Sequence, residues 1–96
     1  MNNKKNYDIK EIIKTLDEPK KDWAKSVIRI QYDGYPVTLD IRKVNVNTKI
    51  IGSGISLNDE NVDELVNILL EEGYGSSESI KQAYRKRFMI GDDENE

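Results

Sequence analysis

Residues 37–57 constrain the fold of this chain more than any other stretch. Apolar Val37, Leu39 and Ile41 alternate with polar Thr38, Asp40 and Arg42. That period of two is typical of a half-buried β-strand, and we expect Arg42 on its open face. A second apolar run, residues 50–57, contains two glycines, which permit a bend or a close approach of another backbone. This stretch therefore predicts one regular strand followed by a kinked one.

A further strand is predicted at residues 23–32, between turn signals. The preceding segment, residues 17–22, contains Pro19 and charged residues, and Asp33-Gly34 is a strong hairpin signal. If Ile28 and Ile30 pack inward, Lys25, Val27, Arg29 and Gln31 lie on the other face.

Residues 7–16 fit two structures. Ile9, Ile12, Ile13 and Leu16 have the i, i+3, i+4, i+7 spacing of a helix stripe. The β-branched isoleucines also permit a strand. Periodicity alone favours the helix.

Two helices are predicted after residue 57. Asn58 is a good N-cap, Asp59 and Glu60 favour the first turn, and Gly73 ends the helix. A second helix begins at Ser76 or Ser77 and runs to about residue 89.

Composition narrows the class of protein. Ninety-six residues form one small domain, with 36% hydrophobic and 34% charged residues, for which dimerisation would add stability. The chain has no cysteine and no histidine, so disulfides, thiol chemistry and the commonest acid–base group are excluded. No signal peptide or transmembrane run is present, which predicts a cytoplasmic protein with no membrane partner. We predict no enzymatic activity, catalytic residue, metal, cofactor or small-molecule substrate.

The net charge of −3 conceals a segregation of charge along the chain. Residues 7–57 hold nine basic and seven acidic residues, whereas residues 58–73 hold six acidic residues and no basic one. Residues 74–91 are basic again, with four bases and one acid. Phosphate binding depends on local potential, so the strand region is the predicted nucleic-acid surface.

The chain resembles the positive-cofactor-four family of dimeric single-stranded-DNA-binding proteins, in particular its short bacterial members. The resemblance rests on Asp40-Ile41-Arg42, residues 52–57 (GSGISL), Glu60 and Leu65, with Trp23 and the strand from Arg29 to Tyr32 at the family's spacing. It runs from about residue 7 to about residue 70. It implies that residues 7–16 form a strand, which we adopt.

The predicted fold is α+β: a curved antiparallel sheet of about four strands, then a helix and a second short helix, assembled as a two-fold dimer. The predicted organisation is a flexible N-terminus (1–6), a single-stranded-DNA-binding domain (7–73), an extra helix (74–91) and an acidic disordered tail (92–96). The apolar positions predicted to form the dimer interface are Val62, Leu65, Ile68, Leu69, Ile80 and Tyr84.

The predicted function is largely sequence-independent binding of single-stranded DNA, with RNA as a possible second ligand. The candidate contacts are Trp23, Lys25, Arg29, Tyr32, Arg42, Lys43 and Lys49. Such a site needs cations along the phosphates and aromatic rings under the bases. The resemblance implies that Arg42 and Lys49 contact DNA and that Tyr32 stacks on a base. Arg42 could instead only pair with Asp40, and Tyr32 or Trp23 could be packing residues.

The sequence also departs from the family. Relatives often carry an aromatic residue where this chain has Val44 and Asn45, and a basic one where it has Ser53. Residues 54–85 are similar to ribbon-helix-helix repressors, which bind duplex DNA, and this is the alternative function. A protein-interaction module without nucleic acid is the third.

Overall fold

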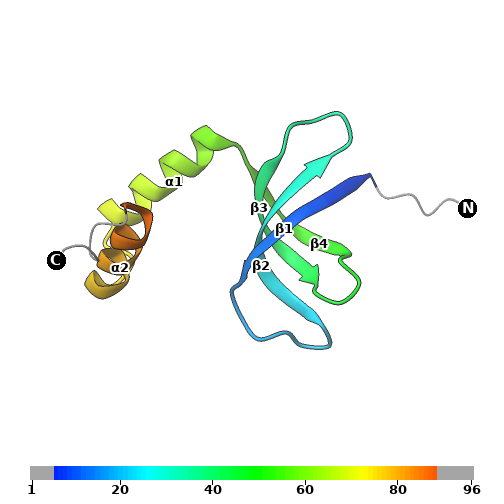
Figure 1. Cartoon of the computed structure of the whole chain (residues 1–96), viewed down its shortest axis with the longest axis horizontal. Helices are drawn as coiled ribbons and strands as arrows, with labels where there is room; N and C mark the ends of the chain where they lie inside the picture. The colour runs from blue at the N-terminus through cyan, green and yellow to red at the C-terminus, as the bar shows by residue number, and fades with distance from the viewer. Residues whose placement is uncertain (1–5, 89–96) are drawn as a thin grey trace, which may run out of the picture. The chain divides into compact units, whose positions relative to one another are not determined.

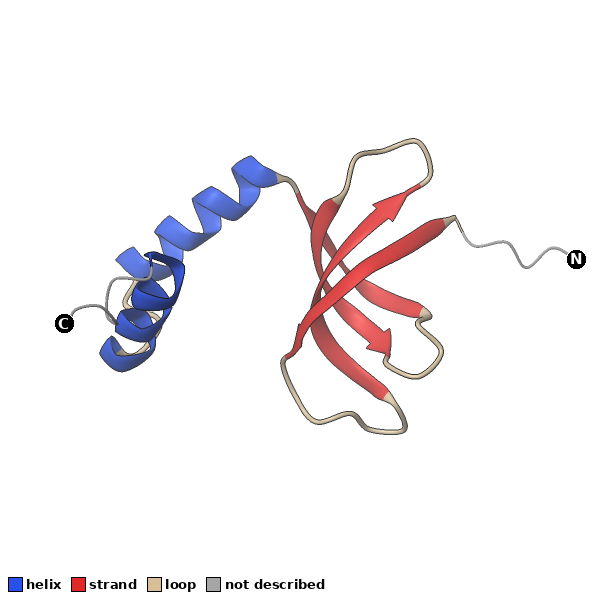
Figure 2. Cartoon of the chain, in the orientation of Figure 1, coloured by secondary structure: helices blue, strands red, loops and turns tan. Residues whose placement is uncertain are grey.

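The computed structural model describes residues 6–88 and contains one four-stranded antiparallel sheet and two helices. The strands are β1 (Tyr7–Thr15), β2 (Trp23–Tyr32), β3 (Thr38–Asn45) and β4 (Ile51–Leu57). They pair in chain order, β1-β2-β3-β4, so each strand lies beside its neighbours in sequence (Figure 1). The α+β prediction and the four antiparallel strands are thereby confirmed. The strands coil strongly, as Figure 2 shows in red.

Two bulges in β1 explain why the apolar residues of this strand have a helix-like spacing. Its register with β2 shifts twice, between Ile9 and Glu11 and again between Ile12 and Lys14. Each bulge inserts one residue and so changes which side chains share a face. Ile9 and Ile12, three residues apart, consequently both pack against the core. The strand assignment is correct, and a strict alternation of its isoleucines would be wrong.

The core lies on one face of the sheet, here called the inner face. Ile28 and Ile30 of β2 and Val44 of β3 have no exposed surface there. Five half-buried side chains pack around them: Tyr7, Ile9, Ile12, Tyr32 and Ile51. Ala24, Ser26 and Asp40 are buried too. The alternate residues of β2 and β3 form the opposite, outer face, as the burial pattern of β2 requires.

The two edge strands approach each other at one end of the sheet. The hydroxyl of Tyr7 in β1 accepts a hydrogen bond from the backbone N–H of Ile51 at 3.3 Å. It also donates to the carbonyl of Lys49 at 3.4 Å. This contact between residues more than forty positions apart holds the coiled sheet around its small core.

The strand connections are tight. Lys20 and Trp23 exchange two backbone hydrogen bonds across Lys21 and Asp22, which both have positive φ. Two left-handed residues define the turn type that suits a hairpin. The predicted turn at Asp33-Gly34 joins β2 to β3, with Gly34 at φ 81°.

Both helices begin as predicted and α1 ends as predicted, whereas the predicted end of the second helix, near residue 89, lies outside the described residues. The Oδ1 atom of Asn58 accepts from the N–H of Asn61, which caps α1 (Asp59–Glu71). Gly73 and the following residue donate to the carbonyls of Leu70 and Leu69, the hydrogen-bond pattern of a Schellman motif. Ser76 caps α2 (Ser77–Phe88) through its hydroxyl. Neither described helix is long and apolar enough to cross a membrane.

The chain divides into two compact units, Met1–Asp63 and Glu64–Glu96. The first contains the sheet and the start of α1, and the second contains the rest of α1 and α2. The predicted acidic tail, and the predicted flexible N-terminus apart from Asn6, lie outside the described residues.

Candidate nucleic-acid interface

The seven predicted contact residues lie in three different places. Trp23, Lys25, Arg29 and Lys43 lie on the outer face, Tyr32 and Arg42 lie on the inner face, and Lys49 lies in the β3–β4 connection. The register of β2 and β3 separates Arg42 from Lys43, because Arg42 is opposite buried Ser26 and Lys43 is opposite exposed Lys25. The outer-face group is therefore the one that the fold brings together.

Arg42 is enclosed, so the expectation that it stands on an open face was wrong. Its guanidinium pairs with the carboxylate of Asp40 through Nε and Nη2, both at 2.8 Å. Its Nη1 donates to the carbonyl of Gly52 at 2.9 Å. Only 13% of the Arg42 side chain is exposed, and none of Asp40. Coiling of the sheet places these polar side chains beside the core.

The Asp40 carboxylate is the centre of a buried hydrogen-bond network. It accepts from the hydroxyls of Tyr32 at 2.7 Å and Thr38 at 2.9 Å as well as from Arg42. Burial by itself would raise the pKa of Asp40, but hydrogen bonds from Tyr32, Ser56, Thr38 and Arg42 lower it below its usual value. The pKa of Tyr32 is raised, chiefly by burial and by donation to Asp40. The network stays ionic at neutral pH and ties β2, β3 and β4 together.

The outer face carries a pair of like charges directly opposite each other. Lys25 of β2 and Lys43 of β3 are register partners, and both are exposed. Like charges at opposed positions destabilise a sheet. Among residues 6–88, no carboxylate forms a salt bridge with either lysine. The fold therefore gains nothing evident from this pair, and within these residues neither ammonium is neutralised by an ion pair.

Trp23 lies beside the two lysines and packs on a glycine. A side-chain carbon added to Gly52 would meet the Trp23 ring at 3.4 Å and the Lys43 Cβ at 3.3 Å. Trp23, Lys25 and Lys43 also line one hollow of about 400 Å³, together with Lys20, Asp17, Glu18 and Ala24. We call the group Trp23, Lys25, Lys43 and Lys20 the outer-face cluster. It combines a half-buried aromatic ring with three cations, and the acidic side chains of Asp17 and Glu18 border it.

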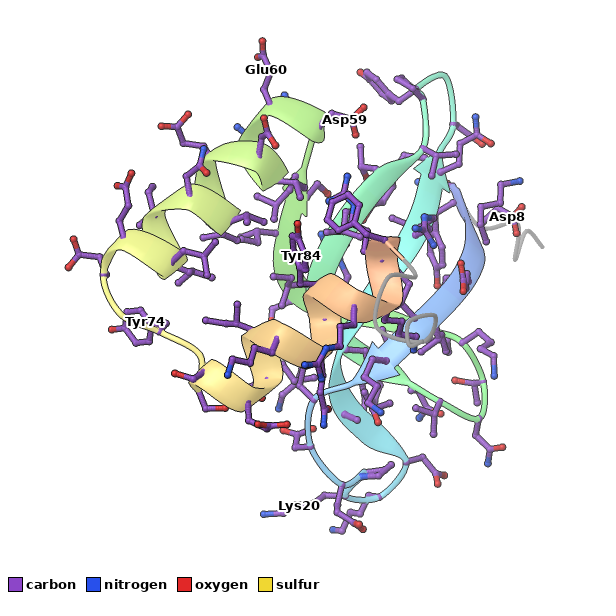
Figure 3. All side chains as sticks on the ribbon, turned by 60° about the vertical axis from the view of Figure 1, so that its left-hand side comes forward. Asp8, Lys20, Asp59, Glu60, Tyr74 and Tyr84 are labelled. Carbon is purple, nitrogen blue, oxygen red and sulfur yellow. The ribbon has the colours of Figure 1, made fainter. Side chains whose placement is uncertain are left out.

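Lys20 is the member of this cluster that the sequence did not suggest. It lies at the β1–β2 connection, where Figure 3 labels it. A bridge to Trp23 across the left-handed turn fixes its backbone. In the sequence, the only indication that Lys20 belongs with Trp23 is its position three residues earlier. That spacing brings the two residues together only because residues 21 and 22 form a tight left-handed turn.

Arg29 extends the basic surface of the outer face. It lies four residues after Lys25 on β2, about 13 Å along the strand. Its guanidinium pairs with Glu11 of β1, and both side chains are more than half exposed. An ion pair this exposed contributes little to stability, so an incoming phosphate could replace Glu11 at small cost.

Tyr32 and Lys49 lie apart from the outer-face cluster. The Tyr32 ring is half-buried on the inner face, 6.4 Å from that of Tyr7, and its hydroxyl is committed to Asp40. The Lys49 ammonium donates to the Val46 carbonyl in its own loop. Lys49 lines a different hollow, with six residues of β1. The arrangement of Tyr32 agrees with a packing role, whereas Lys49 is an exposed loop residue.

The six predicted interface residues lie on α1 and α2. Ile68, Leu69, Ile80 and Tyr84 are exposed, and Val62 and Leu65 are half-buried. Neither described helix contains a fully buried residue. Both described helices therefore expose apolar side chains. In the comparisons with known proteins, no family model matches this chain, and no curated protein is significantly similar to it.

Proposed function

We propose that this protein binds single-stranded nucleic acid, in the first place DNA, on the outer face of its sheet and without enzymatic chemistry. The observation that supports this most is the opposed pair Lys25 and Lys43 beside the ring of Trp23. Single-strand binding needs cations for the phosphates and a ring on which any base can stack. The family resemblance points to the same ligand, although through different residues.

The order of the cations on the outer face suggests the path of the bound single-stranded nucleic acid. Lys20 and Lys43 flank Trp23 at one end, Lys25 follows, and Arg29 lies further along β2. Successive phosphates of an extended strand could contact these groups while one base rests on Trp23. Stacking accepts every base, so we propose little sequence preference.

A homodimer is part of this proposal. Exposed apolar residues on α1 and α2, among them Ile68, Leu69 and Tyr84, offer surface that a second copy would bury. Two copies would present two outer-face clusters to one strand. Duplex binding of the ribbon-helix-helix kind needs the strand before the helix to pair with its mate in the dimer. Here β4 is the edge strand of a four-stranded sheet, paired with β3 over Leu39 to Val44, and the ribbon-helix-helix alternative gives that sheet no role, so we do not favour it.

Fluorescence anisotropy with a labelled single strand and its duplex, over a series of salt concentrations, tests the proposal. We expect the wild type to prefer the single strand. Lys25→Ala and Lys43→Ala should each lower the salt slope by about 0.7, the value for one lost phosphate contact on a single strand. Trp23→Leu should weaken binding by about 1–3 kcal/mol without changing that slope.

Lys10→Ala is the matched control. It removes the same charge, but from a β1 side chain that pairs with Asp8 and lies outside the outer-face cluster. Its affinity should remain close to that of the wild type. A preference for duplex would favour the repressor alternative, and no binding at low salt would leave a protein-interaction module. An RNA strand of the same sequence shows whether the sugar matters.

A further inference from the structure

The side chain of Arg42 is connected to the outer-face cluster through the carbonyl of Gly52. Its guanidinium reaches across from β3 to β4 and donates to the carbonyl of Gly52 at 2.9 Å. Its Nη2 also lies 3.5 Å from the hydroxyl of Ser56. Gly52 in turn supports the ring of Trp23 on the other side of the sheet. Arg42 on the inner face and Trp23 on the outer face therefore share one residue.

Gly52 lies in a β-bulge. The register of β3 with β4 passes from Arg42–Gly54 to Val44–Ile51, so Gly52 and Ser53 together oppose Lys43. A bulge interrupts the ladder of backbone hydrogen bonds and redirects the neighbouring side chains. Because the ladder is interrupted here, the hydrogen bond from Arg42 is an additional restraint on the Gly52 carbonyl.

The β4 backbone lies close to β3 at Arg42, which brings the carbonyl of Gly52 within reach of the Arg42 guanidinium. A side-chain carbon added to Gly54 would overlap the Cβ and Cα atoms of Arg42 and the carbonyl of Ile41. Only glycine allows the β4 backbone to lie this near the start of the Arg42 side chain. Gly54 and Gly52 thus have distinct roles. Gly54 allows the β4 backbone to lie close to Arg42, and Gly52 allows the Trp23 ring to pack against the β4 backbone.

Arg42 is poorly placed to contact a phosphate itself. Four of its five N–H groups face Asp40, Gly52 or Ser56. Reaching a ligand would leave the fully buried carboxylate of Asp40 without its cation, an arrangement that proteins avoid.

We infer that Arg42 is a positioning residue: through the carbonyl of Gly52, it holds the bulge on which Trp23 and Lys43 are seated for the ligand. This inference rests on the proposed function, and it assigns to Arg42 a role other than the DNA contact that the family resemblance implies. Loss of the Arg42–Gly52 hydrogen bond should displace the Trp23 ring and weaken binding, while the number of phosphate contacts stays the same.

The test compares Arg42→Gln, Arg42→Lys and Gly52→Ala with the wild type, each first shown to be folded by circular dichroism and thermal melting. Trp23 is the only tryptophan, so its emission in the free protein reports the ring directly. We expect the emission of all three variants to differ from that of the wild type. We expect affinity for the single strand to fall about 5-fold or more, as for impaired stacking of one base, with an unchanged salt slope.

Arg42→Lys separates the two roles of Arg42. A lysine keeps the charge but lacks the planar fork that joins Asp40 to Gly52, so it should not rescue binding if Arg42 is a positioning residue. Gly52→Ala leaves Arg42 intact and inserts a methyl group under the Trp23 ring, and it should reproduce the loss even if the Arg42 variants do not fold. Lys10→Ala is the matched control, because Lys10 lies outside the outer-face cluster and the variant should retain affinity, slope and emission.

Several results would overturn the inference. A fall in slope of about 0.7 in Arg42→Gln, restored by Arg42→Lys, would make Arg42 a phosphate contact. Unchanged affinity in folded Arg42→Gln or in Gly52→Ala would reduce the link to a structural role. If the wild type binds no single strand, the proposed function fails, and unchanged Trp23 emission in the variants would separately refute the Arg42–Gly52–Trp23 link.

Discussion

Replacing Asp40 by asparagine should destabilise the sheet by about 3–5 kcal/mol, the usual cost of breaking a buried ion pair. The carboxylate has no exposed surface and accepts from Tyr32, Thr38 and Arg42 at 2.7–2.9 Å. Asparagine keeps the shape but presents an amide N–H₂ where one acceptor oxygen was. Arg42 is then left partly unpaired beside the core.

The measurement is equilibrium unfolding in urea, followed by Trp23 fluorescence and by circular dichroism. A chain of this length has about 5–14 kcal/mol of stability in total, so the variant should be measured with a stabilising osmolyte present. Asp8→Asn is the matched control, since its ion pair with Lys10 has 69% and 44% exposed side chains. That control should change the free energy of unfolding by less than about 0.5 kcal/mol.

A double variant tests whether the loss of stability in Asp40→Asn comes from leaving the charge of Arg42 unpaired. Asp40→Asn combined with Arg42→Met removes both charges, so neither partner is left as an uncompensated buried charge. The double variant should therefore recover much of the stability lost in Asp40→Asn. A loss below about 1 kcal/mol in Asp40→Asn, with an unchanged urea m-value, would refute the view that this network holds the inner face together.

Three further predictions concern pH, two glycines and a helix cap. The pKa of Asp40 is lowered, so the contribution of Asp40 to stability should be lost as the pH falls below 3.8. The pKa of Tyr32 is raised, so the contribution of Tyr32 should be lost as the pH rises above 10.0. Thermal melts of Tyr32→Phe should lack this loss of stability at alkaline pH. Gly54→Ala should cost at least about 3 kcal/mol in urea unfolding because the added carbon overlaps Arg42, whereas Gly34→Ala, which meets open space at φ 81°, should cost about 1 kcal/mol. Asn58→Ala should remove the α1 cap and cost about 0.5–2 kcal/mol, seen as a lower melting temperature of the helical circular-dichroism signal, and an unchanged melt would contradict the capping role.

The strands and helix ends of this protein were predictable because local chemistry determines them. Asn58, Gly73 and Ser76 cap or end helices through hydrogen bonds that involve only nearby residues. The strand at residues 7–15 was harder, because two bulges give Ile9 and Ile12 a helix-like spacing on one face. Bulges depend on a partner strand, and a single stretch of sequence does not contain that information.

The candidate site was predicted only in part, because alternation shows which residues share a face but not which face is enclosed. Leu39 and Ile41 suggested that their side of β3 was interior, yet the core lies on the side of Asp40 and Arg42. The missing information was the register that places Ile28 opposite Asp40. Lys25 and Lys43 were named as candidates, but their pairing depends on the same register.

The chain-order pairing of the strands has a consequence for how this protein folds during synthesis. Every strand finds its partner in the segment made just before or just after it, and the three connections span only seven, five and five residues. Short loops close at small entropic cost, and local pairings form quickly. The sheet can therefore assemble one hairpin at a time as the chain leaves the ribosome. Arg42 would be made before Gly52, so its network would close only when the last strand arrives.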